Sequence, residues 1–168
     1  MDGDALRSLQ EPLKQRYREE PEAALVTLSA SGTLDEQITC SVQTARALAI
    51  AGLHPATGGD GSALCSGDML LEALVACAGV TLRAVATALE VPVQGGTITA
   101  EGVLDFRGTL AVDRDAPVGF GDIALRFDLD APGASEEQLA TLLKLTERYC
   151  VVLQTLRGAP AVSAEIST

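Results

Sequence analysis

Tryptophan is absent from this chain of 168 residues, and aromatic residues make up only 3% of it. Without large rings, the core must be filled by leucine, valine, isoleucine and alanine, which supply less volume per residue. Hydrophobic residues still amount to 47%, as is normal for a globular protein. The length suits a single domain over residues 1–168, or one protomer of a tight oligomer. We expect such an aliphatic core to benefit from a large shared interface.

Basic residues are also scarce, with 12 Lys and Arg against 23 Asp and Glu, so the formal charge is −11 at pH 7. An anionic chain without a basic tract repels nucleic acid and anionic lipid, which predicts no nucleic-acid partner and no membrane partner. The first residues lack the basic segment and apolar run of a signal peptide. The longest apolar stretch, around residues 69–78, is too short to span a bilayer. We therefore expect a cytoplasmic location.

Closely spaced metal ligands are missing as well. No two of the four cysteines form a C-x-x-C pair, and the only histidine, His54, lies eleven positions from its nearest cysteine. This spacing disfavours a structural zinc site, and a cytoplasmic location disfavours structural disulfides. The glycine-rich run 58–61 is not a phosphate loop, because no Lys-Ser/Thr pair follows it. We expect no bound metal and no cofactor.

Hydrophobic periodicity predicts the elements of the first half of the chain. Residues 4–20 indicate a surface helix, which forms an N-terminal extension over residues 1–20. Apolar and alternating runs predict strands over residues 23–31, ending at Gly32, and over residues 37–44 and 46–51. Residues 54–68 are rich in glycine, serine and proline, which is typical of a loop.

The second half begins with a run, residues 68–90, that is apolar on most of its circumference and predicts a long buried helix capped by Ser66. Gly79 in mid-helix costs about 1 kcal/mol against alanine, which suggests close packing against another element. A second helix starts at the capping box Ser135–Gln138 and stops at Gly158 and Pro160. Alternation predicts strands over residues 97–108, 120–129 and 161–166, with a connection over residues 113–119.

The order of elements defines the fold class. Strands come in hairpins on either side of the long helix, and no βαβ unit repeats, which predicts an α+β fold. One small, aromatic-poor protomer would struggle to cover a helix that is apolar all round. We therefore expect a homodimer with the long helices at its centre.

Cys77 and Cys150 are the residues whose chemistry needs testing, since both fall on predicted helices. A free cysteine is most often a small buried hydrophobe, so core packing is one interpretation. The other is a redox role, favoured by charges that would need partners in apolar helices. These charges lie near the two cysteines in sequence: Glu72, Arg83, Glu147 and Arg148.

The chain resembles the OsmC/Ohr family in a series of short segments. They are Gly58-Gly59-Asp60, the helix start 66–71, the alanine-containing stretch 73–77 that ends in Cys77, and residues 147–152 around Cys150. The resemblance runs from about residue 23 to the end of the chain. It implies an intertwined homodimer in which antiparallel sheets pack around two long helices and both chains contribute to each active site.

The resemblance also implies an activity, the thiol-dependent reduction of organic hydroperoxides in a stress response. Cys77 would attack the peroxide as a thiolate, and Cys150 would resolve the resulting sulfenic acid to a disulfide. An external dithiol of the lipoyl or thioredoxin type would then reduce the disulfide.

The family activates its first cysteine with an arginine that a glutamate orients. A mid-helix cysteine gains little from its own helix dipole, so we expect a nearby cation here too. Arg46 is the leading candidate, although a solvated charge on an edge strand is an equal alternative. Where the family has Pro-Glu at the helix start this chain has Gly67-Asp68, so the carboxylate is Asp68 or, one turn later, Glu72. These departures keep open a second function, a non-catalytic protein that binds an apolar small molecule in a cavity at the dimer interface.

The remaining candidates have simpler interpretations. Cys65, in the loop before the long helix, is an inert thiol or an additional redox-active one. Cys40 shares the apolar face of its strand with Ile38 and Val42, which favours core packing. His54 precedes a proline and is either a turn residue or part of a pocket rim.

Overall fold

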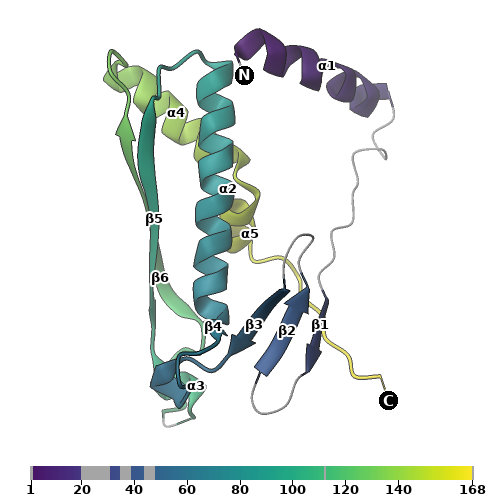
Figure 1. Ribbon diagram of the computed structural model, residues 1–168, viewed down its shortest axis with the longest axis vertical. Coiled ribbons are helices and arrows are strands. Elements are labelled where there is room, and N and C mark those ends of the chain that lie inside the picture. Colours follow the sequence, from purple (N-terminus) through teal and green to yellow (C-terminus); the bar gives the residue numbers. More distant parts are fainter. Residues whose placement is uncertain (1, 20–30, 35–38, 44–47, 112, 168) are drawn as a thin grey trace. The chain divides into compact units, whose positions relative to one another are not determined.

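The computed structural model describes residues 2–19, 31–34, 39–43, 48–111 and 113–167 (Figure 1). They form two compact units. The first takes its residues from Met1–Leu6, Ala73–Ile98 and Phe127–Thr168, and the second from Arg7–Glu72 and Thr99–Arg126. Both predicted cysteines of interest, Cys77 and Cys150, belong to the first unit.

Helix α1, Gly3–Glu19, confirms the predicted N-terminal helix. The side chain of Asp2 accepts a hydrogen bond from the backbone N–H of Ala5 at 2.8 Å, which satisfies one of the donors that a helix start leaves open. Near its other end, Gln15 donates to Glu19 at 2.6 Å, one turn along the same face.

A four-stranded sheet follows, in the order β1-β2-β3-β4. Its strands are β1 (Ser31–Leu34), β2 (Thr39–Gln43), β3 (Leu48–Gly52) and β4 (Leu64–Cys65). The first three pair in antiparallel fashion, and β4 pairs in parallel with β3. The strands predicted over 37–44 and 46–51 are confirmed in their described parts. The strand predicted over 23–31 lies outside the described residues apart from Ser31, and its predicted end is wrong because Gly32 pairs with Val42 inside β1.

The loop predicted over residues 54–68 contains two short elements that its composition did not indicate. One is β4, and the other is the 3₁₀ helix η2, Pro55–Thr57. His54 caps η2, because its Nδ1 accepts a hydrogen bond from the N–H of Ala56 at 3.0 Å. The imidazole also stacks on the ring of Phe106, with 4.9 Å between centroids. His54 is therefore a turn residue, as one of its two interpretations held.

Strands β5 (Gly95–Leu104) and β6 (Phe120–Asp130) form a two-stranded ribbon and run in opposite directions in Figure 1. The strand predicted over 120–129 is confirmed, whereas the one predicted over 97–108 ends early. Asp105 stops it, because its carboxylate accepts the N–H of Arg107 at 3.0 Å and caps helix α3, Phe106–Thr109.

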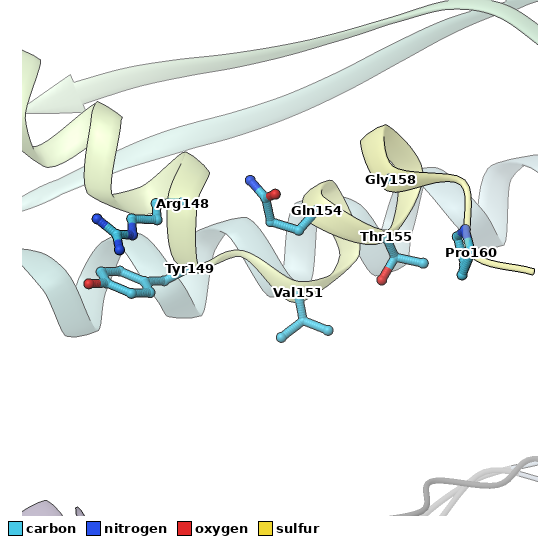
Figure 2. Close-up of a pocket in the computed structure, with 7 residues that line it drawn as sticks. All are labelled: Arg148, Tyr149, Val151, Gln154, Thr155, Gly158 and Pro160. Atoms are coloured by element: carbon cyan, nitrogen blue, oxygen red, sulfur yellow. The ribbon is translucent and has the colours of Figure 1, made fainter. Parts of the chain in front are cut away.

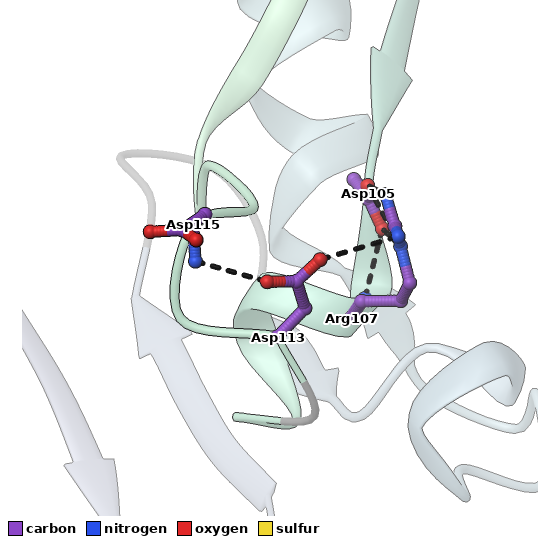
Figure 3. A network of polar contacts seen from close by, with 4 residues as sticks. All are labelled: Asp105, Arg107, Asp113 and Asp115. Carbon is purple, nitrogen blue, oxygen red and sulfur yellow. Dashed lines mark hydrogen bonds and ion pairs between the residues drawn. The ribbon is translucent and has the colours of Figure 1, made fainter.

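The connection between β5 and β6 is held by a small polar network, shown in Figure 3. The Arg107 guanidinium pairs with Asp105 and, at 3.3 Å, with Asp113. The other carboxylate oxygen of Asp113 accepts the N–H of Asp115 at 3.0 Å. The side-chain hydrogen bond and the charge of Arg107 hold the pKa of Asp105 below its usual range. All of these groups are solvent-accessible, so their role is to shape the connection.

Helix α2, Ser66–Ala88, corresponds to the long helix predicted over residues 68–90, and Ser66 is its first residue rather than its cap. The close packing expected at Gly79 is confirmed, because a Cβ there would lie 3.2 Å from the Cδ1 of Ile98. By length and composition alone α2 could cross a membrane, which is weak evidence because core helices of soluble proteins share these properties.

The all-round burial predicted for α2 is wrong for the single chain. The fully buried residues form one stripe with a spacing of four: Leu74, Ala78, Leu82 and Ala86. Val80, on another side of the helix, is 73% exposed. Only one face of α2 is covered by the described residues, so much of its apolar surface faces outward.

The second predicted helix is two helices, α4 (Glu136–Tyr149) and α5 (Val151–Gly158). The predicted capping box is confirmed: Gln138 N–H donates to the Ser135 hydroxyl at 3.2 Å, and the Gln138 side chain accepts from Ser135 N–H at 2.9 Å. The helix is interrupted at Cys150, whose ψ of 106° lies in the extended range. The predicted stop is confirmed at Gly158, after which Ala159 has a positive φ of 40°.

The strand predicted over residues 161–166 is wrong, since residues 159–167 form no strand and are exposed. Alternation alone does not make a strand, which also needs a neighbouring backbone to complete its ladder. Among the described residues no strand pairs with this segment.

The core of the first unit is aliphatic, as predicted. Its buried residues come from α2, the segment after it and α4: Leu82, Ala86, Val91, Val93 and Leu142. This packing holds α4 against the second half of α2 and thereby sets the position of the junction at Cys150.

Candidate functional site

The structure brings Cys77 and Cys150 together, although they are 73 residues apart in sequence (150 − 77). Cys77 lies on α2 and is half-buried, while Cys150 lies at the α4–α5 junction and is 0% exposed. Both are free thiols. The two thiols lie close enough to influence each other, because Cys150 lowers the pKa of Cys77 and Cys77 raises the pKa of Cys150. The two sulfurs therefore form a dithiol pair.

The interruption of the helix at Cys150 brings the start of α5 to Cys77 and so affects the ionisation of its thiol. The first N–H groups of any helix lack partners within that helix. In α5 the N–H groups of Val151 and Val152 lower the pKa of Cys77, whose sulfur lies on a different helix. Since a helix N-terminus carries partial positive charge, this arrangement favours an anionic sulfur.

Burial raises the pKa of the Cys77 thiol, but hydrogen bonds to its sulfur outweigh burial and lower the pKa overall. The donors, in order of their effect, are the N–H of Val152, the thiol of Cys150, the N–H of Val151 and the hydroxyl of Thr81. Thr81 follows Cys77 by four residues on α2, so the two side chains share a face of that helix. The site therefore favours the thiolate at Cys77.

Cys150 behaves in the opposite way. Burial raises its pKa most; the Leu153 amide opposes this, Cys77 raises the pKa further through its thiol and its negative charge, and the Val152 amide lowers it slightly, so that the pKa is raised overall. The thiol of Cys77 thus ionises more readily than an ordinary thiol, and that of Cys150 less readily. This asymmetry is what a nucleophilic thiol and a second, reserve thiol require.

The carboxylates predicted near the cysteine, Asp68 and Glu72, lie on the part of α2 that belongs to the second unit, and both are exposed. Within the described residues neither carboxylate has a hydrogen bond or an ion pair. They precede Cys77 by nine and five residues, which at about 3.6 residues per turn places both on other sides of the helix. Arg46, the predicted cation, lies outside the described residues.

The two other arginines considered near the cysteines have different partners. Arg83 donates to the backbone carbonyl of Val93, and the Arg148 guanidinium lies 5.5 Å from the ring centroid of Tyr149. In the described part of the chain, the groups that lower the pKa of Cys77 are thus backbone amides and neutral side chains. Nothing in the sequence signalled them, because no glycine or proline marks a helix break at Cys150.

The remaining cysteines belong to the second unit. Cys65 is half-buried at the end of β4, where its sulfur would lie 3.5 Å from a Cβ at Gly67. Cys40 lies in β2, opposite Leu34 of β1 and Ala51 of β3.

A pocket of about 460 Å³ lies at the α4–α5 junction, next to Cys150 in the chain (Figure 2). Val151 and Thr155 point to one side of α5, while Gln154 points to the other. Polar and apolar groups both line it: Arg148, Tyr149, Val151, Gln154, Thr155, Gly158 and Pro160. No sequence pattern indicated this pocket, because it depends on the same helix break.

The family model described as OsmC-like protein matches residues 59–165, so the chain belongs to the OsmC-like family. Among solved structures, an OsmC-like protein from Mycoplasma pneumoniae is similar, with a TM-score of 0.67 and 17% identity over 79% of this chain and 89% of that one. At such identity the likeness shows a shared fold.

Two further solved structures are described as organic hydroperoxide resistance proteins. The Legionella pneumophila protein has a TM-score of 0.60 and 17% identity, covering 80% of this chain and 92% of its own. Bacillus subtilis OhrB has a TM-score of 0.53 and 16% identity, covering 80% and 93%. Among curated protein sequences, no match is found.

Proposed function

We propose that this protein is a thiol-dependent peroxidase that reduces organic hydroperoxides through Cys77 and Cys150. The observation that carries the proposal is the opposite tuning of two adjacent thiols, with the pKa of Cys77 lowered and that of Cys150 raised. The hydroperoxide resistance described for two proteins of the same fold supports the choice of substrate.

The reaction runs in three steps. The Cys77 thiolate attacks the terminal oxygen of the hydroperoxide, the O–O bond breaks, and the alkoxide takes up a proton to leave as an alcohol. The Cys150 sulfur then attacks the sulfur of the Cys77 sulfenic acid, which forms the disulfide and releases water. An external dithiol reduces the disulfide and is itself oxidised to a disulfide.

Exposure determines which sulfur the reductant reaches. Cys150 is 0% exposed, whereas Cys77 is only half-buried. An incoming thiolate of the lipoyl or thioredoxin type should therefore attack Cys77 and expel Cys150 as the leaving thiolate. The proposed cycle takes place in the cytoplasm, where such reductants keep thiols reduced.

A homodimer belongs to this proposal, with a second copy covering the apolar outer face of α2. Val80 on that face is 73% exposed in the single chain, which is unusual for a large apolar side chain on a central helix. In such a dimer, Arg46 and one of the carboxylates Asp68 and Glu72 would add a cation and its orienting partner to the amide donors at Cys77.

The alternative is a non-catalytic protein of the same family that binds a small molecule. Two observations favour it: no cation contacts Cys77 in the part of the chain that the structure describes, and a pocket lies beside the junction. This alternative makes Cys77 and Cys150 a buried polar pair without turnover.

One experiment separates the two functions. The reduced protein receives one equivalent of cumene hydroperoxide, and peptide mapping by mass spectrometry locates the oxidised residues. A Cys77–Cys150 disulfide, absent in the Cys150→Ser variant and retained in Cys65→Ser, is the expected result. An unchanged mass supports the binding protein, and a disulfide that uses Cys65 or Cys40 instead overturns the assignment of the pair.

A further inference from the structure

A buried hydroxyl lies one helical turn before Cys150. Thr146 is 1% exposed, and its Oγ1 has no hydrogen-bond partner within the part of the chain that the structure describes. Leaving a buried hydroxyl unpaired is unfavourable, so such groups in proteins commonly serve a ligand, a water or a state of the protein other than the resting one. The reaction cycle at Cys150 provides such a state.

Helix geometry directs this hydroxyl and the Cys150 thiol to the same place. Leu142, Thr146 and Cys150 follow each other at intervals of four, all three are buried, and the N–H of Cys150 donates to the carbonyl of Thr146 at 2.9 Å. The φ of Cys150, −71°, is helical, and only its ψ departs. Its Cα–Cβ bond therefore tilts toward the N-terminus as in a helix, over the turn that holds Thr146.

The charged side chains of α2 and α4 near this position bind partners other than the two cysteines. On α4, Glu147 pairs with Arg157 at 3.0 Å and Arg148 lies over the Tyr149 ring, while on α2 Arg83 binds the Val93 carbonyl. None of them contributes to the pKa of either cysteine. The Thr146 hydroxyl is thus a neutral polar group one helical turn before Cys150, and its hydrogen-bonding capacity is unused in the part of the chain that the structure describes.

We propose that Thr146 is a positioning residue for the resolving step: its hydroxyl donates a hydrogen bond to the Cys150 sulfur once Cys77 has become a sulfenic acid. This inference rests on the proposed peroxidase function and adds to it the group that prepares the second thiol. Before the reaction the Cys150 thiol stabilises the ionised form of Cys77, and oxidation of Cys77 to the sulfenic acid removes that anion.

The resolving step shows why a donor is needed. Cys150 loses its proton, its thiolate sulfur attacks the Cys77 sulfur, the S–S bond forms, and the S–O bond breaks to release hydroxide, which takes up the proton as water. Burial raises the pKa of Cys150 and so opposes the loss of that proton. A hydroxyl that donates to the developing thiolate compensates within an apolar site.

The first test needs no peroxide. In a background with Cys40, Cys65 and Cys77 replaced by Ser, Thr146→Val is compared with Thr146→Ser, and the ionisation of Cys150, which needs no reagent to enter the buried site, is followed against pH by the ultraviolet absorbance of the thiolate. The midpoint should lie about one pH unit higher in Thr146→Val, the effect of losing one hydrogen bond to an anion. Thr146→Ser, which keeps the hydroxyl, should titrate like the background protein. Thr146→Ala replaces Thr146→Val if the latter does not fold.

The second test uses the otherwise wild-type chain and one equivalent of cumene hydroperoxide. Thr146→Val should form the Cys77 sulfenic acid at the normal rate, form the disulfide about tenfold more slowly, and accumulate more Cys77 sulfinic acid. An unchanged Cys150 midpoint in Thr146→Val overturns the role of Thr146. Absence of both sulfenic acid and the Cys77–Cys150 disulfide in the unmodified chain overturns the proposed function instead, so the two failures are distinguishable.

Discussion

The side chain of Gln154 donates a hydrogen bond of 2.7 Å from Nε2 to the backbone carbonyl of Glu147, across the break between α4 and α5. The carboxylate of the same Glu147 accepts a second contact from α5, from Arg157 at 3.0 Å. These contacts fix the direction in which α5 begins. Since the first N–H groups of α5 lower the pKa of Cys77, we expect a bond on the far side of the junction to influence the reactivity of Cys77.

Gln154→Leu should therefore lower the reactivity of Cys77 indirectly, because Cys77 itself is unchanged. Loss of one neutral hydrogen bond is worth about 1 kcal/mol, so we expect alkylation of Cys77 at neutral pH to slow about threefold to fivefold. Site-resolved iodoacetamide labelling measures the rate. Thr155→Val, a substitution at the next residue of α5, is the matched control. Arg157→Ala should have a smaller effect, because the Arg157–Glu147 pair is 54% and 40% exposed. Equal rates in Gln154→Leu and Thr155→Val would contradict this role of Gln154.

The pH dependence of the first step follows from the direction of the Cys77 pKa. Burial opposes ionisation of Cys77, but its hydrogen bonds prevail and lower the pKa. The rate of sulfenic acid formation should thus rise with pH and level off at a lower pH than for an ordinary thiol. Cys150→Ala removes one donor to the thiolate, so its profile should shift to higher pH. Stopped-flow measurements with cumene hydroperoxide in single turnover give both profiles, and coincident profiles would show that the Cys150 thiol does not assist Cys77.

Substitution of Cys77 and substitution of Cys150 should have different effects on peroxide turnover. Cys77→Ser should abolish turnover, because it removes the thiol with the lowered pKa. Cys150→Ser should permit one turnover and leave Cys77 as a sulfenic acid, then as a sulfinic acid under excess peroxide. Mass spectrometry with a sulfenic acid trap follows both. Full multiple turnover in Cys150→Ser, or trapped sulfenic acid on Cys150 in Cys77→Ser, would reverse the assignment.

Arg46→Ala tests how much a cation adds to the amide donors. A charge near the sulfur would lower the pKa of Cys77 beyond what the helix start achieves, so the variant should show a higher alkylation midpoint and slower reaction with peroxide. The matched control is Arg46→Lys, which keeps the positive charge and should stay closer to the unmodified chain in both quantities. If Arg46→Ala changes neither quantity, the amides and neutral donors of Cys77 are sufficient.

Much of the fold could be predicted from the sequence, since its signals are local. The capping box at Ser135 and the stop at Gly158 depend on residues that act within a few positions, and Gly79 suggested a close approach without indicating that Ile98 makes it. The resemblance also singled out Cys77 and Cys150, which the structure brings into contact.

The rest depends on contacts between segments distant in sequence. The break at Cys150 is a change of one ψ angle among residues that would otherwise continue a helix, and it is stabilised by tertiary packing and by Gln154. For that reason the sequence contained no sign of the second helix start at Cys77, while the cation that it predicted, Arg46, lies outside the described residues and stays a prediction. The segment 161–166 shows the same limit, since its alternation carries no information about a partner strand.

The outer face of α2 gives the last prediction, which concerns assembly. In a dimer with α2 at its centre, Val80 becomes buried, so Val80→Asp would place an unpaired charge in an apolar interface at a cost of several kcal/mol. We expect the unmodified chain to scatter light as a dimer at micromolar concentration and Val80→Asp as a monomer of 17.3 kDa with an unchanged circular dichroism spectrum. Val118→Asp is the matched control, because Val118 is similarly exposed, at 64% against 73%, but lies in the connection before β6. A stable monomer in the unmodified chain, or loss of the dimer in Val118→Asp alone, would contradict a dimer built on this face.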